Sequence, residues 1–403
     1  MVTGAADDDP SGIGTYSQAG AQFGYGLSWS LLFSLPFMTV IQDVAAQIGT
    51  VTGRGIAANL RRHYPRPLLW SAVSLLLIAN VINLGADLTA MGAVIEMLIG
   101  GEVAVYTVGA GLLCVLLETF LSYRRYAAVL KFATLSLFAY VAVVLTVGVP
   151  WGQAIEALFV PHIEWTAAFA TGFVAILGTT ISPYLFFWQA AQEIEEARRT
   201  HSKPLYVAPR EAGPEMARIR QDTLVGMVFS NLVAIFILFA AAATLHAHGI
   251  TTISTASQAA EALRPVAGRF AFALFALGII GTGLLAVPVL AGSAAYAVSE
   301  MFGRPASLDS SPAKARLFYG TIAATTLAGA SLQYVGINPV RALYWSAVIN
   351  GVLAAPLMAL MMLIVTNPRA MGHLTLSLRG VILGWAATAV MTVATLLFFV
   401  SLF

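Results

Sequence analysis

The 403-residue sequence has little charge: Asp, Glu, Lys and Arg make up only 10% of it, and hydrophobic residues make up 59%. Soluble domains carry about 25% charged residues. An ordinary soluble globular protein is therefore excluded, and a lipid bilayer is the expected surrounding of most of the chain. The formal net charge of +2 gives no indication of a nucleic-acid partner.

Cysteine is almost missing as well, since Cys114 is the single one. This excludes a disulfide framework and a metal cluster held by several thiolates. The first residues lack a basic segment followed by an apolar core, so we expect no cleavable signal peptide. No glycine cluster follows a strand-like run, which excludes a phosphate-binding loop of the nucleotide-binding type.

Long apolar runs are what the chain has instead. A run of about 20 apolar residues predicts a helix that crosses a bilayer. Glycine and proline inside such runs are tolerated, because neighbouring helices can satisfy the freed backbone groups. Ten full-length candidates are found, at 27–49, 69–92, 102–121, 126–149, 166–190, 222–246, 270–300, 317–335, 343–366 and 380–402.

Basic residues gather in alternate loops. If the chain crosses the membrane at each candidate, one side carries most arginines and lysines, and the other carries only Arg264, Arg269 and Arg341. Positive loops mark the cytoplasmic side. We therefore expect a multi-pass protein of the cell (inner or plasma) membrane with cytoplasmic basic loops, in which 27–49 runs inward. The basic positions are Arg54, Arg61, Arg62, Arg66, Arg124, Arg125, Arg198, Arg199, Lys203, Arg210, Arg218, Arg220, Arg304, Lys314, Arg316, Arg369 and Arg379.

The opening stretch "DDDPSGIGTYSQAG" must supply the preceding outward crossing. From Pro10 to Gly24 it has about 15 residues, which span only about 22 Å as a helix. One interpretation is an ordinary helix start, with Asp9 as N-cap and Pro10 at the first helical position. The other is the outer half of a broken membrane helix, whose inner half is nearly absent and survives here as "VTGAA".

A second break is predicted within 166–190, where Gly178 and Pro183 bracket "TTIS". Pro183 alone would indicate only a kink. If the opening half-helix is the first, this segment is the sixth and runs the opposite way. Paired broken helices in two inverted halves point to the substrate site of a transporter. We therefore expect one all-α transporter domain over 1–403 with about 11 membrane helices: a first repeat of five helices at about 1–150, a second at about 164–366, and an extra helix at about 380–402.

The residues at the two breaks are rich in oxygen. Asp9 and the hydroxyls of Ser11, Thr180 and Ser182 stand there together with backbone carbonyls near Ser11 and Thr179. Oxygen ligands suit hard cations such as Mg²⁺, Ca²⁺ and Mn²⁺, and an acid inside the membrane is a functional candidate by default. The neighbouring Asp7 and Asp8 either line the approach to this site or face water.

Further polar residues interrupt the apolar segments. Asn80, Asn83 and Asp87 share a face of the segment 69–92 by their spacing. These asparagines, with Asn231 and Asn350, either line a pathway or join helices by hydrogen bonds. Asp43 lies toward the inner end of 27–49 and is a candidate for an inner vestibule. The pathway candidates are Asp8, Asp43, Asn83, Asp87 and Asn350.

Three motifs give a resemblance to a known family. The run "DPSGIGTYSQAGAQFGYGLSW", the run "GTTISPY" and the run "TNPRAMG" resemble the Nramp family of divalent-metal transporters. The resemblance implies a LeuT-like fold of the APC superfamily, with an inverted five-plus-five repeat and broken helices 1 and 6. It also implies that the protein is not an enzyme, has no cofactor, and needs only the divalent metal and the bilayer as partners, with no obligatory protein partner.

The sequence departs from the family at both motifs. The family's Asp-Pro-Gly-Asn is Asp9-Pro10-Ser11-Gly12 here, and its Met-Pro-His is Ser182-Pro183-Tyr184. The soft sulfur ligand and the histidine linked to proton movement are both replaced. The acidic relay of helix 3 is represented at most by Asp87, in a shifted register. By the resemblance, the metal site comprises Asp9, Ser11, Gly12, Thr179, Ser182 and Tyr184.

These departures resemble the Nramp-related magnesium transporters, which implies import of Mg²⁺ and/or Mn²⁺ without proton coupling. The alternative is a proton-coupled Mn²⁺ or Fe²⁺ transporter of the main branch, against which Ser182 argues. An intramembrane hydrolase with paired aspartates would need a second acidic motif facing Asp7 to Asp9, and none is evident. A carrier of organic solutes on the same fold would not need Asp9.

Overall fold

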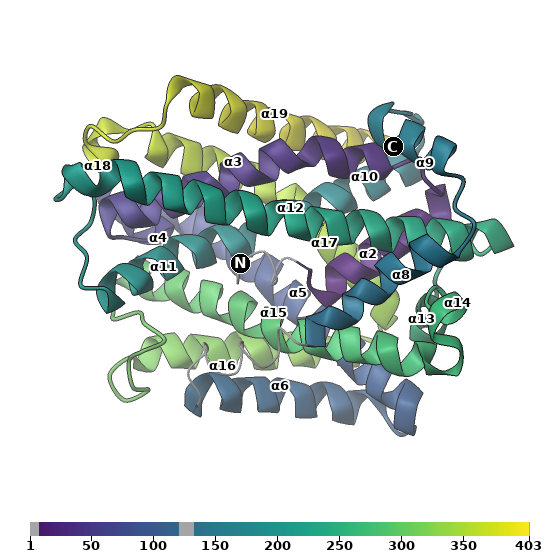
Figure 1. Ribbon diagram of the computed structural model, residues 1–403. Helices are drawn as coiled ribbons and strands as arrows, with labels where there is room; N and C mark the ends of the chain where they lie inside the picture. The colour runs from purple at the N-terminus through teal and green to yellow at the C-terminus, as the bar shows by residue number, and fades with distance from the viewer. Residues whose placement is uncertain (1–7, 121–132, 403) are drawn as a thin grey trace.

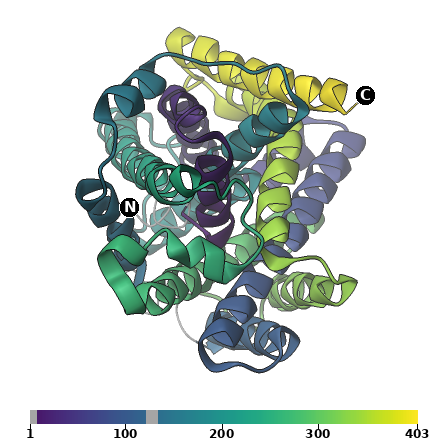
Figure 2. The same ribbon diagram turned by 90° about the vertical axis from the view of Figure 1, so that its right-hand side faces the viewer.

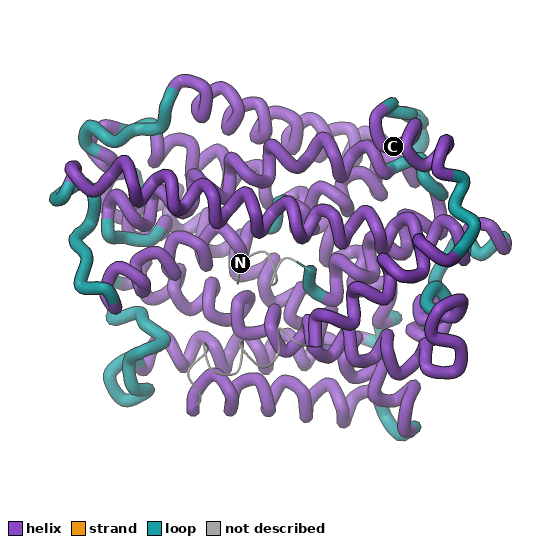
Figure 3. Tube along the Cα trace, in the orientation of Figure 1, coloured by secondary structure: helices purple, strands orange, loops and turns teal. Residues whose placement is uncertain are grey.

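The computed structural model describes residues 8–120 and 133–402, and this part of the chain is built from helices without a strand (Figure 3). The long helices run side by side in one bundle, with α19 (Leu378–Ser401) along one edge and α6 (Val103–Phe120) along the opposite edge (Figure 1). Helices satisfy their own backbone hydrogen bonds, which is what a bilayer requires. The all-helical fold expected from the composition is confirmed.

The remaining long helices follow in chain order. They are α2 (Pro10–Phe23), α3 (Ser28–Thr52), α5 (Arg66–Ile99), α10 (Ala167–Thr180), α11 (Pro183–Arg199), α12 (Ala212–Thr244), α15 (Ala271–Phe302), α16 (Arg316–Ser331) and α17 (Pro339–Val365). Shorter pieces connect them. These are α4 (Ile56–His63), η1 (Ala133–Leu137), α8 (Phe138–Thr146), α9 (Trp151–Phe159), η2 (Pro209–Glu211), η3 (His246–His248), α13 (Ala256–Glu261), α14 (Arg264–Ala267), η4 (Gly268–Phe270), η5 (Leu332–Val335) and α18 (Pro368–Met371).

Helix α2 lies in the middle of the bundle, although its sequence is rich in small and polar residues. It is packed against α12, α17 and α10, and every residue from Pro10 to Ala21 is buried (Figure 2). The helix begins as expected, because Asp9 has extended backbone and its side chain accepts the N–H of Gly12. An inner half of this helix would fall in residues 1–7, which lie outside the described residues.

The break in the second half is present but narrower than expected. Helix α10 ends at Thr180, α11 begins at Pro183, and only Ile181 and Ser182 are non-helical between them. Gly178 was expected to mark the break, and it lies instead inside α10. A Cβ atom on Gly178 would stand 2.0 Å from the carbonyl oxygen of Ala347, so this glycine allows α17 to cross closely.

Not all of the ten full-length helices expected are found among the described residues. Eight helices of the described residues are long and apolar enough to cross a membrane, or nine if one bent pair counts as a single span. The described part of 126–149 begins at residue 133, with η1 followed by α8, and the chain turns by 120° between Leu135–Thr146 and Trp151–Phe159, where this segment ends. Residues 121–132 lie outside the described residues. Helix α16 ends at Ser331, short of 335, and continues as η5. The count of 11 and the repeat boundaries stay predictions.

Candidate metal site

The carboxylate of Asp9 is the centre of the site, and it is only 2% exposed. Its Oδ1 accepts the backbone N–H of Gly12 at 2.7 Å and the hydroxyl of Ser11 at 2.6 Å. The start of α2 thus holds one oxygen in place and leaves the other for partners from elsewhere in the bundle. The positive end of the helix dipole also favours a negative charge at this position.

The second oxygen, Oδ2, connects α2 to other helices. It accepts the amide of Asn83 from α5 at 3.1 Å and the phenol hydroxyl of Tyr184 from α11 at 3.2 Å. Asn83 in turn accepts the amide of Asn350 from α17 at 3.1 Å. Four residues that are far apart in the sequence therefore form one connected polar network in an apolar bundle. The pathway candidates Asn83 and Asn350 both belong to it.

The start of α2 and the end of α10 face each other across Gly12. A Cβ atom on Gly12 would stand 3.1 Å from Oγ1 of Thr179 and 3.5 Å from Oδ1 of Asp9. Helix α10 thus presents its last turn to the first turn of α2, as the pairing of the breaks predicts. The Thr179 hydroxyl is buried and has no hydrogen-bond partner among the described residues. Such a hydroxyl oxygen is free to accept from a water or to contact an ion.

Ser182 lies in the break itself and closes the end of α10. Its hydroxyl donates to the carbonyl oxygens of Gly178 and Thr179, both at 3.0 Å. The hydroxyl proton is therefore used within the protein, while the oxygen keeps lone-pair capacity. Where the family motif has a thioether, Ser182 offers an oxygen that is held rigidly, because two helix-terminal carbonyls fix its direction.

A second carboxyl group lies beside the network on α5. Asp87 is one turn after Asn83, is fully buried, and neither of its oxygens has a hydrogen-bond partner among the described residues. The backbone N–H of Ser11 lies near the Asp87 carboxyl group. An unpaired carboxylate in such a place is costly unless it is neutral or near a cation.

The remaining acidic candidates lie around the site in different places. Asp8 is buried and accepts the hydroxyl of Ser230 from α12 at 3.1 Å. Asp43 is buried in α3 and accepts the amide of Gln47 at 2.8 Å, and no hydrogen bond of the described residues joins it to Asp9. Asp8 is thus held just before the start of α2, whereas Asp43 belongs to a separate part of the bundle.

Two of the asparagines, Asn80 and Asn231, join helices by hydrogen bonds, which was the alternative to lining a pathway. Asn80 donates to the carbonyl oxygen of Leu290 at 2.8 Å and to Ser293 at 2.6 Å, which joins α5 to α15. Asn231 donates to the carbonyl oxygen of Leu31 at 2.8 Å, which joins α12 to α3. The spacing along α5 cannot distinguish the role of Asn80 from that of Asn83, because both lie on one face of the helix. Only their hydrogen-bond partners differ.

Sequence reasoning missed two neighbours of the site. Ser230 has no motif around it, and its role follows only from its contact with Asp8. Met91 lies one turn after Asp87, and its sulfur and Cγ of Pro10 both stand within 3.4 Å of the place that a Cβ of Gly283 would take. The apolar setting of Met91 in the sequence is the same as that of a core residue, so no signal distinguished it.

Comparisons with known proteins show the family of the chain. The family model "Natural resistance-associated macrophage protein-like" (Nramp) matches residues 1–401. The chain belongs to the Nramp family. The divalent metal cation transporter MntH of Klebsiella pneumoniae subsp. pneumoniae is 28% identical over 400 residues, covering 95% of this chain and 88% of that protein. MntH of Deinococcus radiodurans is 27% identical over 300 residues, covering 72% and 66%.

Solved structures have the same fold. The manganese transporter of Eremococcus coleocola, in complex with an aromatic bis-isothiourea substituted compound, superimposes with a TM-score of 0.76 at 16% identity and covers 99% of this chain and 84% of its own. The inward-facing conformation of Mhp1 superimposes with a TM-score of 0.54 at 11% identity, covering 98% and 89%. The fold expected from the two broken helices is therefore confirmed, whereas the magnesium branch stays a prediction.

Proposed function

We propose that this chain carries divalent metal cations across the membrane through the site at Asp9. The observation that supports this most directly is the convergence of the start of α2 and the break between α10 and α11 on one buried carboxylate, with the unpartnered hydroxyl of Thr179 beside it. Relatives of the chain are named as divalent metal cation or manganese transporters. The metal is the transported substrate, and a resident cofactor or an enzymatic reaction has no place in this proposal.

The donor set favours Mg²⁺ and Mn²⁺ as substrates. Asp9, Thr179, Ser182 and Tyr184 offer oxygen atoms, and no three His, Cys, Asp or Glu side chains converge within the described residues. Mg²⁺ prefers oxygen ligands and keeps several of its waters. The small side chains of Gly12 and Ser182 leave room for such waters. A softer site would need the sulfur of the family motif, and Ser182 stands in its place.

Transport without proton coupling is the second part of the proposal. The position of the family's histidine holds Tyr184, whose hydroxyl donates to Asp9 and whose ordinary titration lies near pH 10. The alternative, proton-coupled transport of Mn²⁺ or Fe²⁺, is favoured by one observation, which is the unpaired and buried carboxyl group of Asp87. The two mechanisms differ in whether proton flux accompanies metal flux.

The experiment that tests the site is metal uptake by proteoliposomes that contain the Asp9→Asn variant. The substitution keeps the shape and the N-cap but removes the charge, so uptake of Mg²⁺ and Mn²⁺ is expected to be lost while the thermal stability is kept. The matched control is Asp309→Asn, which removes a carboxylate that pairs with Arg199 at the surface. Uptake by Asp9→Asn near the wild-type level would exclude Asp9 from the site.

A further inference from the structure

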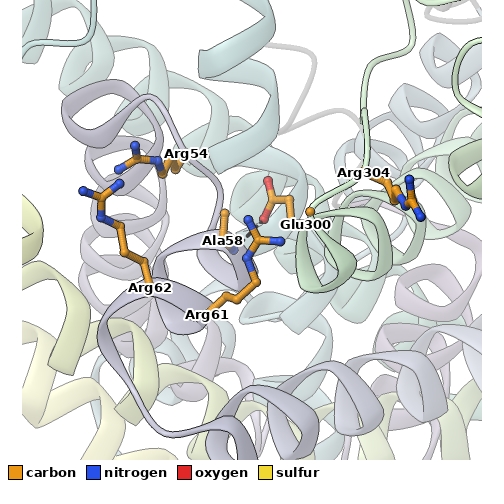
Figure 4. Close-up of a pocket in the computed structure, with 7 residues that line it drawn as sticks. Arg54, Ala58, Arg61, Arg62, Glu300 and Arg304 are labelled. Carbon is orange, nitrogen blue, oxygen red and sulfur yellow. Dashed lines mark hydrogen bonds between the residues drawn. The ribbon is translucent and has the colours of Figure 1, made fainter.

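A cavity of about 450 Å³ lies between α4 and the end of α15, and it shares no residue with the metal site. It is lined by four arginines and one glutamate, together with Ala58 and Gly303. Figure 4 shows Arg54 and Arg62 together on one side of this cavity, Arg61 beside Glu300, and Arg304 on the other side. We refer to Arg54, Arg61, Arg62 and Arg304 as the arginine cluster.

The arginine cluster has no counter-charge within hydrogen-bonding reach. No side-chain hydrogen bond or ion pair is formed by any of its four guanidinium groups in the described part of the chain. Other arginines of the basic loops differ in this respect. Arg199 pairs with Asp309 at 2.8 Å, and Arg218 pairs with Glu215 at 2.6 Å and with Glu193 at 3.0 Å. A role in membrane topology requires only that the charges lie in a loop, and it does not require four of them on one cavity.

Glu300 does not neutralise the cluster. It is half-buried, and its carboxylate accepts the backbone N–H of Ala58 at 3.1 Å, so it is bound to the first turn of α4. The cavity lining thus contains four guanidinium groups and only one carboxylate, which already accepts a backbone hydrogen bond. The positive potential also acts on a neighbour, since burial and then nearby arginines, Arg62 and Arg54 among them, lower the pKa of His63.

We propose that this cavity binds a phosphate-type anion through the arginine cluster. Arginine presents a planar fork of N–H donors that matches phosphate oxygens in pairs, and such charge-assisted hydrogen bonds are about twice as strong as neutral ones. The same chemistry is offered by a free phosphate group in solution and by the headgroup of an anionic phospholipid. The bound anion would join the start of α4 to the end of α15, where Glu300 already connects them.

The test uses the purified full-length protein in nanodiscs of phosphatidylcholine, and its readout is the melting temperature. The first arm adds inorganic phosphate, with chloride at the same ionic strength to account for screening. The second arm replaces part of the lipid by phosphatidylglycerol. A ligand that binds only the folded state raises the melting temperature. We expect a rise in at least one arm, and the arm in which it occurs identifies the source of the phosphate group.

The decisive variant is Arg54→Gln with Arg61→Gln and Arg62→Gln. The matched control is Arg210→Gln with Arg316→Gln and Arg379→Gln, which removes the same charge from exposed positions of other basic loops. Loss of each charged contact is expected to weaken anion binding about tenfold. The cluster variant should therefore lose the rise, and the control should keep it. No rise in either arm, or equal loss in both variants, would overturn the proposal.

A variant that fails to fold does not leave the question open. Arg61→Lys with Arg62→Lys keeps the charge and removes the paired donors, so it is expected to reduce the rise severalfold while the protein still assembles. If binding depended on charge alone, this variant would behave like the wild type, and a specific phosphate site would be excluded.

Discussion

Asn83 donates a hydrogen bond of 3.1 Å to Oδ2 of Asp9, and this contact connects α5 to the start of α2. The amide of Asn83 is itself oriented by Asn350, whose hydrogen bond fixes which end of the side chain faces the carboxylate. Asp9 therefore does not depend on its own helix alone for its position. Its two oxygens are held by different elements, which is how a substrate site can be rigid in a helix that is interrupted.

The first prediction compares two asparagines of the same helix. Asn83→Ala is expected to raise the half-saturating concentration of Mn²⁺ in uptake roughly 10- to 100-fold, because it removes a hydrogen bond to a charged group. Asn80→Ala removes bonds to α15 instead, and should lower the stability by about 1–2 kcal/mol with little effect on the affinity for metal. Concentration-dependent uptake and thermal melting of both variants separate the roles, and equal loss of affinity in both would contradict this assignment.

The second prediction concerns the space between the breaks. Gly12→Ala places a methyl group 3.1 Å from Oγ1 of Thr179 and 3.5 Å from Oδ1 of Asp9, so it should fill part of the site and reduce metal uptake. Gly109→Ala in α6 is the control, because nothing lies within 4 Å of its Cβ position. We expect metal uptake to be several-fold slower in Gly12→Ala and unchanged in Gly109→Ala. Uptake that is unchanged by Gly12→Ala would move the site elsewhere.

The fold class and the capped start of α2 at Asp9 could be predicted from the sequence because both depend on local chemistry, whereas the role of Asp9 in a metal site stays a prediction. The length of an apolar run determines whether a segment can span a bilayer. An Asp-Pro pair predicts the capped start of a helix. The pairing of the two breaks followed from their order in the chain. These expectations needed no knowledge of which helices touch.

What the sequence could not predict depends on contacts between helices. Asn83 and Asn80 have the same local setting, and only Asp9 opposite one and α15 opposite the other distinguish them. From the sequence, Gly178 could either break the helix or allow another helix to pack closely. The carbonyl oxygen of Ala347 beside it shows that it allows close packing.

The third prediction tests how hard the site is. Ser182→Met introduces a thioether, and thioethers favour soft ions. Competition by Cd²⁺ against Mg²⁺ is expected to increase at least severalfold, while the loss of the two hydrogen bonds to Gly178 and Thr179 lowers the stability modestly. Met91→Leu is a useful companion, because it removes the thioether already present near Pro10. A Cd²⁺ preference that is unchanged in Ser182→Met would separate Ser182 from ion selection.

The fourth prediction is that metal transport proceeds without protons. A proton-coupled carrier needs a group that changes protonation during the cycle, and Asp87 is the candidate at this site because its carboxyl group is buried and no hydrogen-bond partner of it is found among the described residues. The membrane potential contributes about 2.3 kcal/mol per charge per 100 mV, hence about 4.6 kcal/mol for a divalent ion, so influx does not require a proton gradient.

The measurement uses proteoliposomes loaded with a pH-sensitive dye and held at a fixed potential, to which Mg²⁺ or Mn²⁺ is added outside. We expect metal uptake without acidification of the lumen, and Asp87→Asn should keep this uptake, since a neutral side chain is what its surroundings favour when no cation is near. The surface variant Asp309→Asn serves as the control for the loss of a carboxylate. Acidification that scales with metal flux and disappears in Asp87→Asn would instead make Asp87 the proton carrier, and would favour proton-coupled transport of Mn²⁺ or Fe²⁺ by this chain.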